Sequence, residues 1–251
     1  MADRVLQVGL FVAVLALPLL MLVFGVVMRR WRIPQLRHLS AFDALRGQLG
    51  RSIEVGHPAH ISIGTGGIGA EDTLVTLAGA SIVDSLAQEA ADTGASPVVS
   101  VADGTALILA QDMLRHPYTR RGDISGYDPL AVQTLGMAPL QYAVGTMDFL
   151  RHSQPVSNVM IGSFGPEVGL IIEAGVRQGL AQVAGSTDAR ALALLYPSAN
   201  HVLIGEEIFA APAYLERRPD QLGRLQAQDM VRYFLIFVII VAAVLRTFFP
   251  G

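Results

Sequence analysis

The run His60-Ile-Ser-Ile63 leads directly into Gly64-Thr-Gly-Gly-Ile-Gly69, and a long helical pattern follows to about residue 92. Gly64, Gly66 and Gly69 have the spacing of a dinucleotide-binding loop, placed between a strand and a helix as that motif requires. Glycines there permit a tight turn and let a phosphate approach the amino end of the helix. Glycines also serve tight turns and close helix–sheet packing without any ligand, so both interpretations stay open.

The same order of strand, loop and helix is repeated through the central part of the chain. Five further β-rich runs, each followed by a loop with Gly or Asp and by a helical pattern, begin near residues 97, 132, 158, 180 and 201. Short apolar strands that alternate with helices are typical of a parallel sheet covered on both faces. Because crossovers are right-handed, six such units predict a doubly wound, mostly parallel Rossmann-like α/β fold.

Ligands of such sheets bind beyond the carboxyl ends of the strands. The candidate cofactor-binding residues therefore lie at that edge: Gly64, Thr65, Gly66, Gly67, Gly69, Asp103, Ser163 and Glu206. A nucleotide or another phosphate is the cofactor that this loop would accept, although the identity of any cofactor stays unknown. The acid of a dinucleotide site lies about 20 residues beyond the glycines, whereas Asp103 follows Gly69 by 34 residues. Glu206 can instead serve a helix dipole.

Composition excludes several kinds of chemistry. The chain has no cysteine, and its 18 basic residues are all arginine. Thiolate nucleophiles, disulfides and cysteine zinc sites are therefore excluded, as are Schiff-base and P-loop lysines. The six histidines are dispersed without metal-ligand spacing, so we interpret them as non-catalytic and expect no metal site. The net charge of −3 predicts no nucleic-acid partner.

An apolar run lies at each end of the chain. Residues 5–28 are 24 residues without a charge, and residues 230–249 are 20 residues with charges only near their ends. About 20 apolar residues span the hydrocarbon core as a helix, so we predict a retained transmembrane helix at each end. Arginines gather beside both runs on the side toward the centre of the chain, for example Arg29 and Arg217. The positive-inside rule then predicts a cytoplasmic central domain, with both termini outside the inner (plasma) membrane.

These patterns divide the chain into four predicted segments. Residues 1–30 are the first transmembrane helix, and residues 31–52 are a juxtamembrane helix or linker that either lies on the membrane or caps the domain. Residues 53–229 are the cytoplasmic Rossmann-like domain, and residues 230–251 contain the second transmembrane helix. The central segment has the size of one domain with a substantial core.

Several stretches of the chain share one family pattern. They are Gly56-x-Pro58-x-His60, Met160-Ile-Gly-Ser-Phe164, Ala184-Gly-Ser-Thr187 and residues 202–211. In these stretches, and over nearly its whole length, the chain resembles an uncharacterised family of bacterial membrane proteins, a domain of unknown function associated with green non-sulfur bacteria. The resemblance implies two terminal membrane helices around a Rossmann-like core, and it implies no activity.

Three functions fit these observations. The first is a self-assembling membrane scaffold or ligand-binding module without catalysis, favoured because the sequence offers no credible nucleophile, metal site or acid–base pair. The second is an accessory subunit of a larger membrane complex, and the third is a membrane-tethered enzyme that uses a nucleotide. The expected partners are the lipid bilayer, further copies of the chain and other membrane-complex subunits. Gly9 and Gly25 in the first run are small enough for close helix contact.

Overall fold

The computed structural model describes residues 37–215 and the single positions 232, 235, 236 and 239. The chain divides into two compact units, His38–Leu215 and a second unit made of Met1–Arg37 with Glu216–Gly251. The predicted membrane runs, residues 5–28 and 230–249, lie outside the described residues except for the four single positions, which are helical. None of the helices within the described residues is both long and apolar enough to cross a bilayer.

The His38–Leu215 unit is built on one six-stranded sheet. Its strands are β1 (Ala59–Gly64), β2 (Pro97–Val101), β3 (Val132–Thr134), β4 (Ser157–Ser163), β5 (Ala181–Ser186) and β6 (His201–Ile204). They lie in the order β3-β2-β1-β4-β5-β6, and every neighbouring pair is parallel. This is the strand order of the dinucleotide-binding Rossmann fold, so the predicted six-unit parallel sheet is confirmed.

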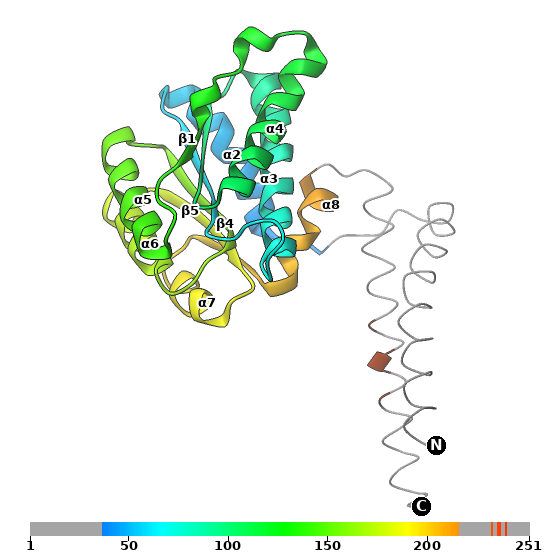
Figure 1. Ribbon diagram of the computed structural model, residues 1–251, viewed down its shortest axis with the longest axis vertical. Coiled ribbons are helices and arrows are strands. Elements are labelled where there is room, and N and C mark those ends of the chain that lie inside the picture. Colours follow the sequence, from blue (N-terminus) through cyan, green and yellow to red (C-terminus); the bar gives the residue numbers. More distant parts are fainter. Residues whose placement is uncertain (1–36, 216–231, 233–234, 237–238, 240–251) are drawn as a thin grey trace, which may run out of the picture. The chain divides into compact units, whose positions relative to one another are not determined.

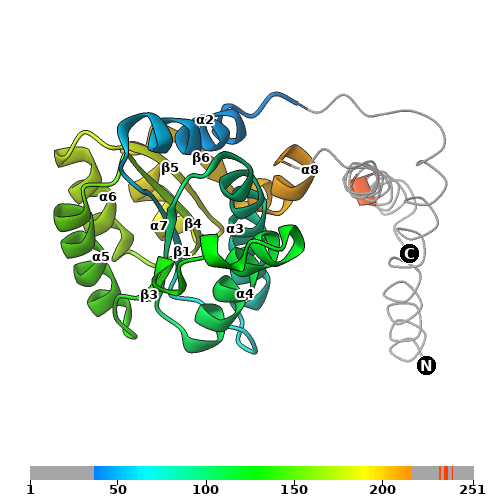
Figure 2. The same cartoon turned by 90° about the horizontal axis from the view of Figure 1, so that it is seen from above.

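Helices cover both faces of the sheet (Figures 1 and 2). The seven α-helices of residues 37–215 are α2 (Ser40–Val55), α3 (Thr73–Thr93), α4 (Gly104–Arg121), α5 (Pro139–Ser153), α6 (Val168–Arg177), α7 (Ala189–Leu195) and α8 (Ala211–Leu215). Short 3₁₀ segments are η1 (Ile124–Gly126), η2 (Pro129–Ala131) and η3 (Gly205–Ala210). Helices α2, α3, α4 and α8 pack on one face, whereas α5, α6 and α7 pack on the other.

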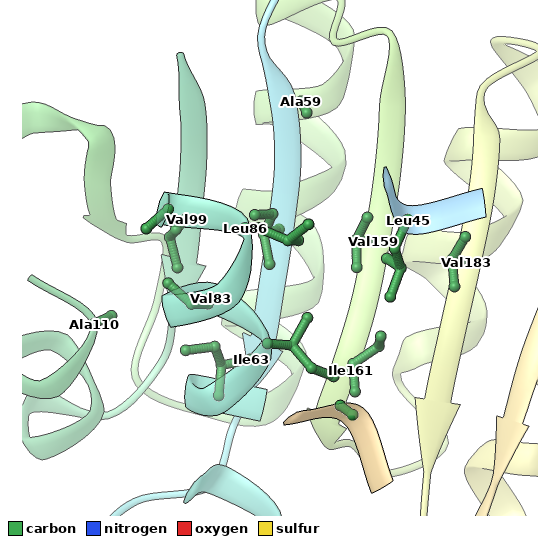
Figure 3. Packing of buried hydrophobic residues seen from close by; sticks show 14 of the residues in the cluster. Leu45, Ala59, Ile63, Val83, Leu86, Val99, Ala110, Val159, Ile161 and Val183 are labelled. Atoms are coloured by element: carbon green, nitrogen blue, oxygen red, sulfur yellow. The ribbon is translucent and has the colours of Figure 1, made fainter. Parts of the chain in front are cut away.

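The first face has an apolar core layer that runs across four strands (Figure 3). Ile61 is in register with Val99 on one side and with Val159 on the other, and Val159 is in register with Val183. All four side chains are at most 2% exposed. Burying each such side chain contributes about 1.5–3 kcal/mol, so this row anchors the helices of that face.

Helix α3 packs closely on this layer because Gly79 has no side chain. A Cβ atom at Gly79 would lie 2.5 Å from the carbonyl oxygen of Ile161 and 3.0 Å from Cγ2 of Ile63. Real Cβ atoms do not approach carbonyl oxygens this closely. The glycine at this position therefore permits the close packing of α3 on the sheet.

Helix α2 caps the domain. Its side chains Phe42, Leu45 and Leu49 are at most 2% exposed and belong to the core of the first face. The Phe42 ring stacks on Tyr214 of α8 with a centroid distance of 4.7 Å. The beginning and the end of the His38–Leu215 unit therefore pack against each other.

Candidate functional site

The glycine-rich loop begins where β1 and β4 meet at their carboxyl ends. Gly64 has a φ of 89°, and the pairing of β1 with β4 shifts register between Ser62 and Gly64. The Thr65 amide donates to the Ser163 carbonyl at 2.8 Å, and a Cβ atom at Gly64 would collide with that same carbonyl. Only glycine meets both the positive φ and the close approach of the two chains.

The next two glycines contact side chains of the protein itself. A Cβ atom at Gly66 would lie 2.5 Å from Oγ1 of Thr76, and one at Gly67 would lie 2.5 Å from the Asp103 carboxylate. The loop thus folds against α3 and against the start of α4. These contacts support the packing interpretation of the glycine spacing. None of them is specific to a phosphate-binding loop.

The glycine-rich loop does not lead directly into helix α3, as a dinucleotide-binding loop leads into its helix. In that motif the last glycines belong to the helix start, whereas α3 begins at Thr73, four residues after Gly69. The Thr73 hydroxyl accepts from the Gly69 amide at 2.9 Å and donates to the Ala70 carbonyl at 2.6 Å. Threonine hydroxyls compete for backbone groups in this way, and the resulting turn separates the loop from α3.

Asp103 lies beside the loop and caps α4. Its carboxylate accepts from the amides of Thr105 at 2.7 Å and Ala106 at 3.3 Å, and also from the Thr105 hydroxyl. The Thr105 hydroxyl bond is the main cause that lowers the pKa of Asp103, with the two amides adding to it. The Ile68 amide donates to Oγ1 of Thr105 at 2.8 Å, which ties the glycine-rich loop to α4.

The structure brings most of the predicted site residues together and separates one of them. Ser163 ends β4 and touches the loop, since a Cβ atom at Gly66 would lie 2.8 Å from Cβ of Ser163. Glu206 follows β6, which is three strands away from β1 in the sheet order. Neighbouring strands are about 4.8 Å apart, so Glu206 lies on the order of 14 Å from the end of β1. Glu206 is therefore not part of the cluster around Gly64–Gly67, Asp103 and Ser163.

The carboxyl edge of the sheet is strongly acidic. Seven acidic residues follow the strands there: Glu71, Asp72, Asp103, Glu167, Asp188, Glu206 and Glu207. Arg190, at the start of α7, donates to Asp188 at 2.8 Å, and this bond is the main cause that lowers the pKa of Asp188 to about 2. Carboxylates repel phosphates, so this edge opposes the anionic ligand that the glycine spacing suggests.

A second polar cluster lies inside the domain, on the face of the sheet that α5 covers. His60 Nδ1 lies 2.8 Å from Asn158 Oδ1, and His60 Nε2 lies 2.8 Å from Ser100 Oγ. The Tyr142 hydroxyl lies 2.7 Å from Ser100 Oγ and 2.6 Å from Ser62 Oγ. All five side chains are at most 1% exposed. They join strands β2, β1 and β4 to helix α5.

The hydrogen bonds of this cluster all run in one direction. Gln182 Nε2 donates to the Ile172 carbonyl at 3.1 Å, and a carbonyl only accepts. The Oε1 atom of Gln182 then accepts from Asn158 Nδ2 at 3.0 Å, which leaves Asn158 Oδ1 as the acceptor for His60.

His60 is neutral, because burial lowers its pKa to about 4 while the Asn158 bond raises it by less. A neutral imidazole that donates from Nδ1 accepts at Nε2, so the Ser100 hydroxyl donates to His60. The Tyr142 hydroxyl then donates to Ser100, whose Oγ lies at 2.7 Å and whose carbonyl oxygen lies at 3.1 Å, and the Ser62 hydroxyl donates to Tyr142. We call the six side chains Ser62, Tyr142, Ser100, His60, Asn158 and Gln182 the buried polar chain.

Residues 3–250 of the chain match the family model Domain of unknown function (DUF6754). The chain belongs to this family. The comparisons with curated proteins and with solved structures give no match. Membership confirms the resemblance to an uncharacterised family, whereas the membrane helices and the bacterial group attached to that resemblance remain predictions.

Within this family member, Ser100, His60 and Asn158 have the order of a nucleophile, a base and an orienting group. A substrate would have to reach Ser100 Oγ, but Ser100 is 1% exposed and Tyr142 already occupies its free side. The Phe149 ring packs on His60 at a centroid distance of 5.1 Å. The arrangement therefore ties α5 to the sheet and offers no accessible nucleophile.

The sequence predicts a non-catalytic His60, and the buried polar chain becomes apparent only in the folded domain. One signal was present, because β1, β2, β4 and β5 each carry at least one polar residue among their buried apolar residues. Only the strand order shows that these residues are neighbours. In residues 37–215, no three His, Asp or Glu side chains come together in a way that could hold a metal ion.

Proposed function

We propose that this DUF6754 protein is a membrane-anchored Rossmann-like module that self-associates and acts as a scaffold or ligand-binding protein without catalysis of its own. The apolar runs at residues 5–28 and 230–249 would hold it in the inner membrane. The arginines beside both runs favour a cytoplasmic domain with both termini outside. Its partners would be the bilayer, further copies of the chain and subunits of a membrane complex.

The observation that supports this function best is that four carboxylates at the carboxyl edge of the sheet already bind backbone amides of the protein. Asp103 and Asp188 each accept from two backbone amides at the start of the next helix. Glu167 accepts from the Gly165 amide at 2.8 Å, and Glu207 accepts from the Ile204 amide at 2.9 Å. A catalytic acid or base must reach a substrate. These carboxylates instead accept hydrogen bonds from backbone amides at or just before the starts of helices.

A membrane-tethered, nucleotide-dependent enzyme is an alternative function. The sheet order and the position of Gly64–Gly69, between β1 and the helix that follows it, match those of dinucleotide-binding domains. The seven acidic residues of the carboxyl edge and the late start of α3 weigh against it. An accessory subunit of a larger complex would share the scaffold architecture and differ only in its partner.

One experiment separates these functions. The full chain is solubilised in mild detergent, its particle mass is measured by native mass spectrometry, and small molecules that remain bound are identified. Thermal unfolding is then followed with inorganic phosphate, ATP, NAD and NADP. We expect several 26.8 kDa copies per particle and no shift with any of these compounds. A particle of one copy contradicts self-association, a foreign subunit supports the accessory role, and a bound nucleotide supports the enzyme.

A further inference from the structure

One stretch of the His38–Leu215 unit differs from the rest in charge. The unit contains seventeen acidic residues and eight arginines, a formal net charge of −9. Residues 129–147 are nineteen consecutive residues without a charge. They cover η2, the edge strand β3 and most of α5.

This uncharged stretch presents large apolar side chains to solvent. Met137 is 81% exposed, Leu140 is 61% exposed and Val144 is 54% exposed. Leu140 and Val144 lie one turn apart on α5, and therefore on the same side of the helix. The opposite side of α5 is buried against the sheet through Tyr142 and Leu150. We call Met137, Leu140 and Val144 the α5 surface.

We propose that the α5 surface is the contact through which two copies of this chain associate. In a two-fold contact the same surface patch of each copy faces the other. An acidic patch would then meet an identical acidic patch and repel it, whereas an uncharged apolar patch can be buried against itself. The α5 surface is an uncharged patch on an otherwise acidic domain, and a second copy is the partner that this charge pattern suits. The assignment rests on the proposed self-association and names its interface.

The absence of cysteine allows a direct test in the full chain. Single cysteines are introduced as Met137→Cys, Leu140→Cys and Val144→Cys, and membranes are treated with copper phenanthroline. A covalent dimer is expected from at least one of the three. The matched control is Leu74→Cys, because Leu74 is 68% exposed and lies on α3, on the other face of the sheet. That variant should stay uncrosslinked.

A charge substitution gives a second readout. In the double variant Leu140→Glu, Val144→Glu, each copy would present two carboxylates to the same carboxylates of its partner. The native mass should fall by half or more, while Leu74→Glu should keep the wild-type mass. Both helices are exposed at these positions, so the domain should keep its circular dichroism spectrum.

Three results would overturn the assignment. An assembled wild-type particle that neither forms crosslinks at the α5 surface nor loses mass in the double variant leaves self-association intact but places the interface elsewhere. A wild-type particle of one copy overturns the interface and the self-association together. Quenching of a bimane label at Val144→Cys by nitroxide lipids would assign lipid, not a second copy, to this surface.

Discussion

His60 donates a hydrogen bond from Nδ1 to Oδ1 of Asn158 at 2.8 Å, across the pairing of β1 with β4, and neither side chain is exposed. This bond determines which nitrogen of His60 carries the proton. It also makes the neutral imidazole part of the connection between the two central strands. A proton added to His60 would place an unpaired charge inside the sheet, where desolvation is costly.

The stability of the domain should therefore fall at mildly acidic pH. The pKa of His60 is about 4 in the folded protein, against 6.5 as its ordinary value. Between these pH values the unfolded chain binds a proton at His60 that the folded chain does not. The contribution of the neutral His60 to stability is therefore fully present above pH 6.5 and is lost as the pH falls to 4. The loss should be on the order of 3 kcal/mol. Thermal unfolding of the full chain in detergent, followed by circular dichroism, measures it.

The control for this pH effect is His60→Gln, which cannot titrate. Carboxylates elsewhere contribute equally to both proteins, so the difference between the two curves isolates His60. The side chains that face the ring are Asn158, Ser100 and Phe149, of which none titrates in this range. Parallel curves for wild type and variant between pH 6.5 and 4 would contradict the role of His60.

Removing the Tyr142 hydroxyl should destabilise the domain. In Tyr142→Phe, the Ser62 hydroxyl loses its acceptor and Ser100 loses a donor, and both are buried. Buried polar groups that lose a partner cost about 1–3 kcal/mol each. Tyr196→Phe is the matched control, because Tyr196 is 67% exposed. Equal unfolding midpoints for the two variants would show that the hydroxyl adds nothing to the link between α5 and the sheet.

Alanine substitutions of two helical glycines should have opposite effects on stability. Gly79→Ala places a Cβ atom 2.5 Å from the Ile161 carbonyl, so α3 must move away from the sheet, at about 1–3 kcal/mol. Gly50 in α2 has nothing within 4 Å of its Cβ position, so Gly50→Ala should stabilise α2 by about 0.5–1 kcal/mol. Chemical denaturation of both variants measures the two signs. A stable Gly79→Ala protein would contradict the close packing of α3.

Loss of the Asp103 cap should weaken α4. Asp103→Ala removes the acceptor for the Thr105 and Ala106 amides, which should cost about 0.5–2 kcal/mol. Asp112→Ala, on the exposed side of the same helix, removes a surface ion pair with Arg115 and should change stability by less than about 1 kcal/mol. The thermal unfolding midpoints of the two variants measure these effects. Equal midpoints would contradict a stabilising capping role of Asp103.

The proposed topology predicts that the central domain is protected in intact cells. Protease added to right-side-out cells should spare residues 38–215 until the membrane is permeabilised. Immunoblotting against the domain follows its survival, with a known outward-facing protein as the control for protease activity. Cleavage within the domain before permeabilisation would place it outside the cell.

The sequence predicts the strands because their signals are local. The run at residues 97–101 is β2 as predicted, and the run at residues 201–204 is β6. Apolar stretches bounded by Gly or Asp report burial and chain reversal within a few residues. The start of α3 is predicted too early, because the glycine spacing does not show that the Thr73 hydroxyl holds a turn after Gly69.

The candidate site is predicted less well because it depends on the strand order. Asp103 and Ser163 lie beside the glycine-rich loop only because β2 and β4 are the two neighbours of β1. Glu206 follows a strand of the same kind, but that strand lies at the edge of the sheet. The buried polar chain joins residues 40 and 98 positions apart in the sequence, a distance over which no local pattern carries information.

The stacking of Phe42 on Tyr214 places the first and last helices of the His38–Leu215 unit side by side. A domain whose two ends are adjacent can be inserted into another chain, or removed from it, without separating the residues on either side. Residues 38–215 therefore have the geometry of a cassette carried between two flanking segments. Because its two ends are adjacent, this cassette could be inserted into a surface loop of another protein without forcing the ends of that loop apart.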